Sequence, residues 1–301
     1  MPGGVIKRRA LLALAFLWPA RGRAESWPRR LTDGLGREVV LARAPRRIVA
    51  IFASNTELLA AIGAAERIVG IEAFTRFPPE VQGLPLVGGR LGFSAEAIAR
   101  LEPDLVVMTP ARNAAHALTE PMARIGVPTL VVTHRDVAQI WRNLRLFGRA
   151  TGLESRAEAL VASLEARLSA VAARLAGRAP VPVFLETSNT GRGVFGTVRP
   201  GSYSFDALRL AGAASVFPDL SAQGPPHVSG EAILRADPAW YLVAGRAEQA
   251  AEVPKRAGFA GLSAVRIGRV HAVARAQFLI PGPRLVDGVE ALAMLLHPDG
   301  A

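Results

Sequence analysis

Short apolar runs separated by segments of helical periodicity fill the first half of the chain. The runs "RRIVAIF" (46–52), "RIVGI" (67–71), "DLVVM" (104–108) and "VPTLVV" (127–132) each have the length of a buried strand. The segments between them are long enough for helices. Alternation of buried strands with helices is typical of a parallel sheet that is covered on both faces.

The segment "SNTELLAAIGAAERIVGI" is predicted to begin with a helix. Ser54 and Glu57 stand three residues apart just before an apolar run, which is the spacing of a capping box. Gly63 suits the end of that helix, because glycine readily adopts the left-handed conformation required there. A further helix is expected over 94–102, and Pro103 stops it.

A long apolar stripe follows in the middle of the chain. Over 155–178 the residues on one helical face are Leu160, Leu164, Leu168, Val171 and Leu175. A helix of this length spans about 36 Å, which is enough to run along two lobes. Residues 138–149 have the same periodicity, and the prolines at 180 and 182 close the segment.

The second half of the chain repeats the first. "FSAEAIARLEPDLVVM" (93–108) and "VSGEAILRADPAWYLV" (228–243) match at an offset of 135 residues. "SFDALRLAGAASVF" similarly echoes "TELLAAIGAAERIVGI". The repeat predicts an α/β fold with two Rossmann-like lobes joined by a single long helix. Clefts between such lobes are common sites for small ligands.

These patterns divide the chain into five segments. The expected parts are a signal peptide (1–24), a leader with a β-hairpin at 32–41 (25–45), a first lobe (46–150), a linking helix (151–180) and a second lobe (181–301). The signal combines a basic head, an apolar run at 11–18 and small residues at 22–24, and is too short to span a bilayer. An amphipathic helix that stays attached is the alternative.

Composition narrows the location and the partners. The chain has no cysteine, which excludes disulfides, thiolate metal sites and a lipid anchor on an N-terminal cysteine. We therefore expect an unanchored protein of the periplasm, exported by the Sec or the twin-arginine route. The formal charge is +11, but five of these charges fall in the first 24 residues, which leaves +6 on scattered arginines. The chain has no basic run with interleaved aromatic residues, which is the pattern that would indicate nucleic-acid binding.

The sequence offers only weak motifs for cofactor binding, metal binding or catalysis. "GRGVFG" (191–196) fits a dinucleotide fingerprint, but "TVRPGS" delays the following helix until about Ser204, so we favour a loop at the cleft rim. The five histidines lie far apart, and only a metal site built from distant residues stays open. No nucleophile motif is found. We expect no catalytic residue, no cofactor and no resident metal site.

Glu96 and Glu231 occupy matching positions in the repeated helix, two residues after Ser94 and Ser229. One interpretation is that each carboxylate interacts favourably with a helix N-terminus. The other is that they are paired negative contacts, one per lobe, for a partner with two-fold symmetry.

The order of these segments resembles the substrate-binding proteins of bacterial ABC importers for iron complexes and vitamin B12, over residues 31–298. The resemblance is carried by "FPPEVQGLPLVGG", both copies of the repeat and the ending "PGPRLVDGVEALAMLLHP". It implies a class III periplasmic-binding architecture, in which two lobes on a rigid helix close only slightly on their ligand. It also implies a monomer whose glutamates at 96 and 231 dock onto arginines of a permease dimer that works with ATPase subunits.

The resemblance also suggests ligand-binding positions. They fall on Phe74, Arg90, Thr109, Phe195, Tyr203, Arg275 and Phe278. An arginine at 90 favours a ferric siderophore over cobalamin, and Gly88-Gly89 count against haem unless Tyr203 supplies the iron ligand. Arg192 and Arg199 would add positive charge if they face the cleft. A chelatase-like cleft enzyme and a binder of bare metal ions are the rival interpretations.

Overall fold

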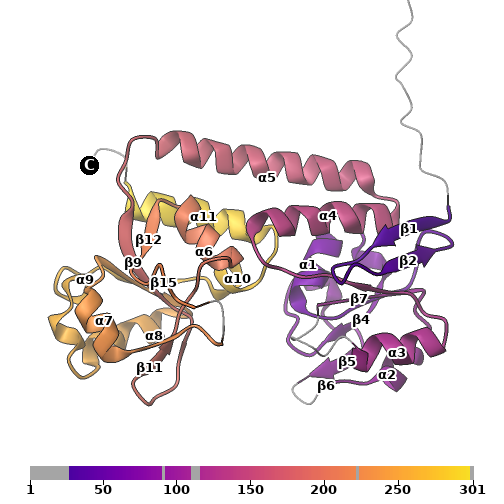
Figure 1. Ribbon diagram of the computed structural model, residues 1–301, viewed down its shortest axis with the longest axis horizontal. Helices are drawn as coiled ribbons and strands as arrows, with labels where there is room; N and C mark the ends of the chain where they lie inside the picture. The colour runs from indigo at the N-terminus through magenta and orange to yellow at the C-terminus, as the bar shows by residue number, and fades with distance from the viewer. Residues whose placement is uncertain (1–26, 90–91, 110–115, 222–223, 299–301) are drawn as a thin grey trace, which may run out of the picture.

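The computed structural model describes residues 27–89, 92–109, 116–221 and 224–298, and its two α/β lobes lie side by side under one long helix (Figure 1). The predicted signal peptide and Arg90 lie outside these ranges. A short antiparallel hairpin, β1 (Arg29–Thr32) and β2 (Glu38–Leu41), precedes the first lobe. The hairpin expected near 32–41 is therefore present, with its first strand beginning earlier, at Arg29.

The first lobe, called the N-lobe below, contains a six-stranded sheet in the order β6-β5-β4-β3-β7-β8. The strands are β3 (Ile48–Ala50), β4 (Ile68–Glu72), β5 (Leu86–Gly89), β6 (Gly92–Phe93), β7 (Leu105–Met108) and β8 (Thr129–Val131). All pairs are parallel except β5 with β6. The four apolar runs predicted as buried strands become β3, β4, β7 and β8.

Helices cover this sheet. They are α1 (Ala53–Ala61), α2 (Ala95–Ala99), α3 (His116–Arg124) and α4 (Val137–Thr151), with 3-10 turns η1 (Ala65–Arg67) and η2 (Pro79–Val81). The expected capping box is wrong: α1 begins directly after Phe52, with no side-chain cap, so Ser54 and Glu57 lie inside it. Both side chains are buried instead of capping the helix. Gly63 does follow the helix end, with φ +86°.

The linking helix is α5 (Glu154–Arg174). It contacts α4 of the N-lobe and helices of the second lobe, and Figure 1 shows it crossing the top of both lobes. Leu164 and Val171 of the predicted stripe are buried. Gly148 of α4 allows close contact with α5, because an added Cβ would lie 2.7 Å from the Cβ of Ala157.

The second lobe, called the C-lobe below, contains a four-stranded parallel sheet in the order β12-β9-β14-β15 and a smaller antiparallel sheet, β10-β11-β13. The strands are β9 (Val181–Glu186), β10 (Ser188–Asn189), β11 (Val194–Gly196), β12 (Ala213–Ser215), β13 (His227–Ser229), β14 (Trp240–Ala244) and β15 (Val270–Val273). The segment "GRGVFG" forms the turn and second strand of the β10–β11 hairpin. It is not a strand-to-helix turn, as a dinucleotide fingerprint requires.

The remaining helices belong to the C-lobe. They are α6 (Tyr203–Leu210), α7 (Gly230–Ala236), α8 (Ala247–Ala251), α9 (Ser263–Arg266), α10 (Arg275–Leu279) and α11 (Arg284–Leu296), with 3-10 turns η3 (Val253–Lys255) and η4 (Phe259–Gly261). The two copies of the sequence repeat start α2 and α7, on different lobes. In each copy the serine caps the helix: Ser94 Oγ accepts from Ala97 N, and Ser229 Oγ accepts from Ala232 N.

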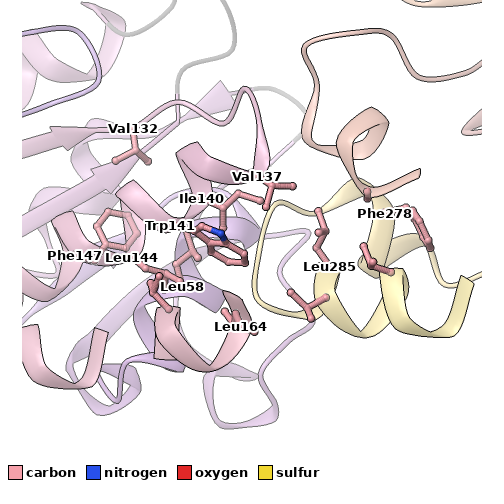
Figure 2. Close-up of a cluster of buried hydrophobic side chains, with 14 of the residues drawn as sticks. Leu58, Val132, Val137, Ile140, Trp141, Leu144, Phe147, Leu164, Phe278 and Leu285 are labelled. Carbon is pink, nitrogen blue, oxygen red and sulfur yellow. The ribbon is translucent and has the colours of Figure 1, made fainter. Parts of the chain in front are cut away.

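One hydrophobic cluster runs from the N-lobe into the C-lobe. Figure 2 shows Val137 and Trp141 of α4 facing Leu285 of α11, with Leu164 of α5 below them. Trp141 and Leu285 are buried. A shared core of this kind resists separation of the lobes, because parting them would expose apolar surface to water.

Candidate ligand-binding cleft

A cavity of about 1010 Å³ lies between the lobes. Its N-lobe wall is built from the ends of α1, β4, β7 and β8, and its C-lobe wall comes from segments before α6 and around α10. Carboxyl ends of parallel strands are the usual ligand side of such sheets. The lining residues are Phe52, Ala53, Ser54, Glu57, Glu72, Phe74, Arg76, Phe77, Thr109, Thr133, His134, Arg135, Arg199, Tyr203, Arg275, Ala276, Leu279, Ile280, Pro281 and Arg284.

Aromatic rings form the N-lobe edge of this cavity. Phe74 is 54% exposed and Phe77 is 39% exposed, both on the loop that follows β4. Large aromatic side chains left open to water are a feature of binding sites, because a ligand that covers them gains hydrophobic free energy. This edge can cover the organic face of a ligand.

Arginines give the cavity a positive character. Arg76 donates to the carbonyl oxygens of Ala73 and Thr75, and Arg275 donates to that of Thr187. These acceptors are neutral, and neither arginine forms an ion pair with another described residue. Fixed guanidinium groups whose charge is not neutralised favour ligands with carboxylate, catecholate or phosphate oxygens.

Two buried carboxyl groups lie in the same wall. Glu57 pairs with Arg284, although burial still raises its pKa above the usual value for glutamate. Glu72, at the end of β4, is 7% exposed and accepts from the backbone N–H of Ala53 at 3.3 Å. Burial raises the pKa of Glu72, and the Ala53 hydrogen bond opposes that shift. No ion pair of Glu72 occurs among the described residues.

His134 follows β8 at the inner wall. Burial lowers its pKa to about 4, so the ring is neutral at physiological pH. The amide nitrogen of Asn143 lies 3.2 Å from Nδ1, and Ser54 Oγ lies 3.3 Å from Nε2. Because the amide can only donate, Nδ1 accepts and Nε2 carries the proton. A metal ion could bind at Nε2 only if the proton left that nitrogen.

The cavity brings together four of the predicted ligand residues: Phe74, Thr109, Tyr203 and Arg275. Their contact with a ligand stays a prediction. Arg90 lies outside the described residues. Arg199 also lines the cavity, whereas Arg192 is exposed on the β10–β11 hairpin and does not line the cavity.

The predicted walls at Phe195 and Phe278 need correction. Phe278 is 1% exposed and packs in the shared core, and Phe195 is 4% exposed and stacks beside Phe259 at 5.5 Å. Neither lines the cavity, because their strands and helices turn these rings toward the interior. Three residues that line the cavity were not predicted from the sequence as site residues: Glu72, His134 and Arg284. The available signal was their position: Glu72 ends a strand, His134 closely follows a strand, and Arg284 begins a helix.

The paired glutamates are exposed on separate lobes. The side chain of Glu96 on α2 is 82% exposed and forms an ion pair with Arg100, one turn along the helix, at 2.7 Å. Glu231 on α7 is also exposed. Figure 1 shows α2 and α7 on the opposite side of the molecule from α5. Both carboxylates therefore point to solvent, and docking stays a prediction.

Comparison with known proteins decides the family. A family model described as periplasmic binding protein matches residues 48–274. The chain belongs to this family. This periplasmic binding protein is 27% identical over 291 residues to the uncharacterized ABC transporter substrate-binding lipoprotein YvrC of Bacillus subtilis, covering 93% of this chain and 89% of that protein.

Two further relatives bind different ligands according to their names. The vitamin B12-binding protein of Salmonella choleraesuis is 30% identical over 209 residues, covering 69% of this periplasmic binding protein and 76% of that one. The periplasmic heme-binding protein RhuT of Roseiflexus sp. RS-1, in its apo form, superimposes with a TM-score of 0.72 and 26% identity, covering 83% of this chain and 97% of that chain.

The described residues lack two features. No group of three or more histidine, aspartate and glutamate side chains suited to holding a metal ion is found in that part of the chain. Nor does any helix there have the length and apolar character required to cross a bilayer.

Proposed function

We propose that this protein is the periplasmic solute-binding component of an ABC importer and that it captures a metal chelate, with ferric siderophores as the first candidate class. The observation that carries the proposal is the interlobe cavity of about 1010 Å³, with exposed phenylalanines on one edge and arginines on both walls. Rings cover the organic part of a chelate, and guanidinium groups neutralise its anionic oxygens. Binding occurs without chemistry.

Cobalamin is the second candidate, favoured by the 30% identity to a vitamin B12-binding protein. Haem is less well supported by the residues of the site. The Tyr203 hydroxyl donates to the carbonyl of Leu279 at 3.0 Å, and burial raises its pKa, so a tyrosinate ligand for haem iron would require breaking that bond in an unfavourable setting.

Capture would involve only limited closure of the lobes. The shared hydrophobic core and the linking helix α5 oppose large hinge motion, and the Glu57–Arg284 ion pair joins the lobes at the cavity itself. The loaded protein would then dock on the permease through α2 and α7. The relative YvrC is described as a lipoprotein, but this chain has no cysteine that could carry such an anchor.

Titration with a ligand panel tests the proposal. We would measure binding of ferric catecholate, hydroxamate and citrate complexes, cobalamin and haem by calorimetry at neutral pH. Phe74→Ala should weaken binding of the true ligand roughly tenfold, as for a truncated aromatic contact. Leu86→Ala is the matched control, because Leu86 is 60% exposed on the same lobe and outside the cavity.

Two outcomes would contradict the proposal. One is that wild-type protein binds no chelate in the panel. The other is that it inserts metal into a porphyrin, which would support the chelatase-like alternative. If wild-type protein binds no chelate in the panel but binds free metal ions tightly, and EDTA removes those ions, the ion-binding alternative is favoured.

A further inference from the structure

A side pocket of about 410 Å³ lies against the C-lobe wall of the cavity. The two hollows share Arg199, Tyr203, Arg275 and Leu279 as lining residues, so they adjoin each other at these side chains. The rest of its lining consists mainly of hydroxyl-bearing and apolar residues. Among the described residues, no carboxylate lines it.

Charge in this pocket favours anions in two ways. Arg199 and Arg275 donate to the carbonyl oxygens of Gly224 and Thr187, and these bonds hold both side chains at the pocket wall. The helix α6 begins in the same wall, after its cap Ser202. The first N–H groups of a helix carry partial positive charge and attract anions.

Thr197 supplies an independent observation. It is 3% exposed, it lines the side pocket, and its Oγ1 is buried with no hydrogen-bond partner among the described residues. A buried hydroxyl with no partner is costly, so this group is expected to gain one when the site is filled.

A neighbouring hollow of about 440 Å³ offers a useful contrast. Arg275 also lines it, but so do Glu186 and Glu252. Arg256 lines that hollow too, but it is already paired with Glu186, so the two carboxylates offset the positive charge there. In the part of the chain that the structure describes, no carboxylate lines the side pocket. The difference places anion binding on the Thr197 side of Arg275.

We propose that the side pocket binds an anionic oxygen group, a carboxylate or a phosphate, on an arm of the ligand whose body fills the interlobe cavity. This rests on the proposed function and makes it more specific. Arg275 and Arg199 pair with the anion, the start of α6 attracts it, and Thr197 donates its hydroxyl. The ligand is therefore selected by an anionic arm as well as by its metal-bearing body.

Matched ligand pairs and single variants test this. The pairs are haem with its dimethyl ester, which differ in carboxylates, and cobalamin with cobinamide, which lacks the phosphate-bearing loop. Arg275→Gln removes the guanidinium, and Thr197→Val removes only the hydroxyl. Arg192→Gln is the control, because it removes the same charge from an exposed position on the same lobe that lines none of the three hollows.

We expect Arg275→Gln to weaken the anionic member of one pair roughly 10- to 100-fold, as for a lost charge-assisted hydrogen bond. Thr197→Val should weaken it roughly tenfold. The uncharged analogue should change by no more than about twofold in Thr197→Val, as for uncoupled sites. Arg275 also lines the cavity, so Arg275→Gln should weaken the uncharged analogue as well, but several-fold less than the anionic member. The pair that responds identifies a carboxylate or a phosphate as the recognised group.

Failure of the inference and failure of the proposed function give different results. Equal losses for both members of a pair, or equal effects of Arg192→Gln and Arg275→Gln, would overturn the side-pocket proposal alone. Wild-type protein that binds no member of either pair, and no ferric siderophore, would overturn the proposed function and the inference with it. If only ferric siderophores bind, ferric citrate against a neutral hydroxamate complex becomes the deciding pair.

Discussion

Arg284, the first residue of α11, forms an ion pair with Glu57 of α1 across the boundary between the lobes. Its Nε donates to one carboxylate oxygen at 3.0 Å, and its second terminal nitrogen donates to the other. The guanidinium also lies 4.1 Å from the ring of Phe77. The Glu57 side chain is 2% exposed, so this arginine is the group that makes its burial tolerable.

Replacing Arg284 by glutamine should therefore destabilise the protein. An unpaired buried carboxylate costs about 3–5 kcal/mol, and we expect about 2–3 kcal/mol because the Arg284 side chain is 27% exposed. Urea unfolding at pH 7 measures the change. The double variant with Glu57→Gln should recover part of the loss, since no charge is then buried.

The control for this experiment is Arg235→Gln, because Arg235 is an exposed arginine of the same lobe. A surface change of this kind is expected to stay within about 0.5 kcal/mol. Equal stability of the Arg284 and Arg235 variants would show that the interlobe pair contributes nothing.

His134 should make the free energy of unfolding depend on pH below about 6.5. Its pKa is about 4 in the folded protein, against 6.5 for an unperturbed histidine, because burial disfavours the charged ring. The unfolded chain therefore binds more protons between these values, and stability falls as pH drops from 6.5 to 4. The full loss is about 3 kcal/mol. Urea unfolding at pH 7 and pH 4.5 should show a smaller difference in His134→Gln than in wild type.

Removing another histidine separates this effect from a general one. His227 is exposed on β13, so His227→Gln should retain the wild-type pH dependence. If His134→Gln and wild type lose the same free energy of unfolding on acidification, the buried ring is not the cause.

Glu72 should have the opposite effect. Burial raises its folded pKa, so its contribution to stability is complete below the unfolded pKa of about 4.5 and is lost as pH rises through the folded value. Glu72→Gln keeps the shape and removes the titration. The variant should gain free energy of unfolding relative to wild type between pH 4.5 and pH 8. A constant difference across that range would mean that Glu72 is not held in an unfavourable charged state.

The order of elements could be read from the sequence because strands buried on both faces leave continuous apolar runs. The runs at 46–52 and 104–108 became β3 and β7, and the stripe that includes Leu164 became α5. The start of α1 could not be read in this way. Ser54 has the spacing of a cap, but it lies inside the helix, where its Oγ is 3.3 Å from Nε2 of His134, 80 residues away.

The site was less predictable for a similar reason. Phe278 and Phe74 are both aromatic residues on short segments after strands, yet one is in the core and the other lines the cavity. The Phe278 ring turns inward because α10 packs against α11, and no local sequence pattern encodes that contact. The Glu57–Arg284 pair joins residues 227 positions apart and was equally invisible.

The last prediction concerns docking. If Glu96 and Glu231 contact arginines of a permease, reversing both to arginine should leave ligand affinity unchanged and abolish uptake. Affinity should hold because neither side chain lines the cavity, and uptake should fail because like charges placed face to face cost several kcal/mol. Uptake of the identified ligand into cells that depend on this protein measures the effect.

The matched control is Glu158→Arg with Glu165→Arg, two exposed glutamates of α5 on the opposite side of the molecule (Figure 1). These changes alter net charge by the same amount, so they should leave uptake near the wild-type level. Normal transport by the Glu96 and Glu231 double variant, with ligand binding intact, would show that the two carboxylates do no more than favour the N-termini of α2 and α7. Loss of transport in the control as well would show that net charge, and not these two contacts, governs delivery.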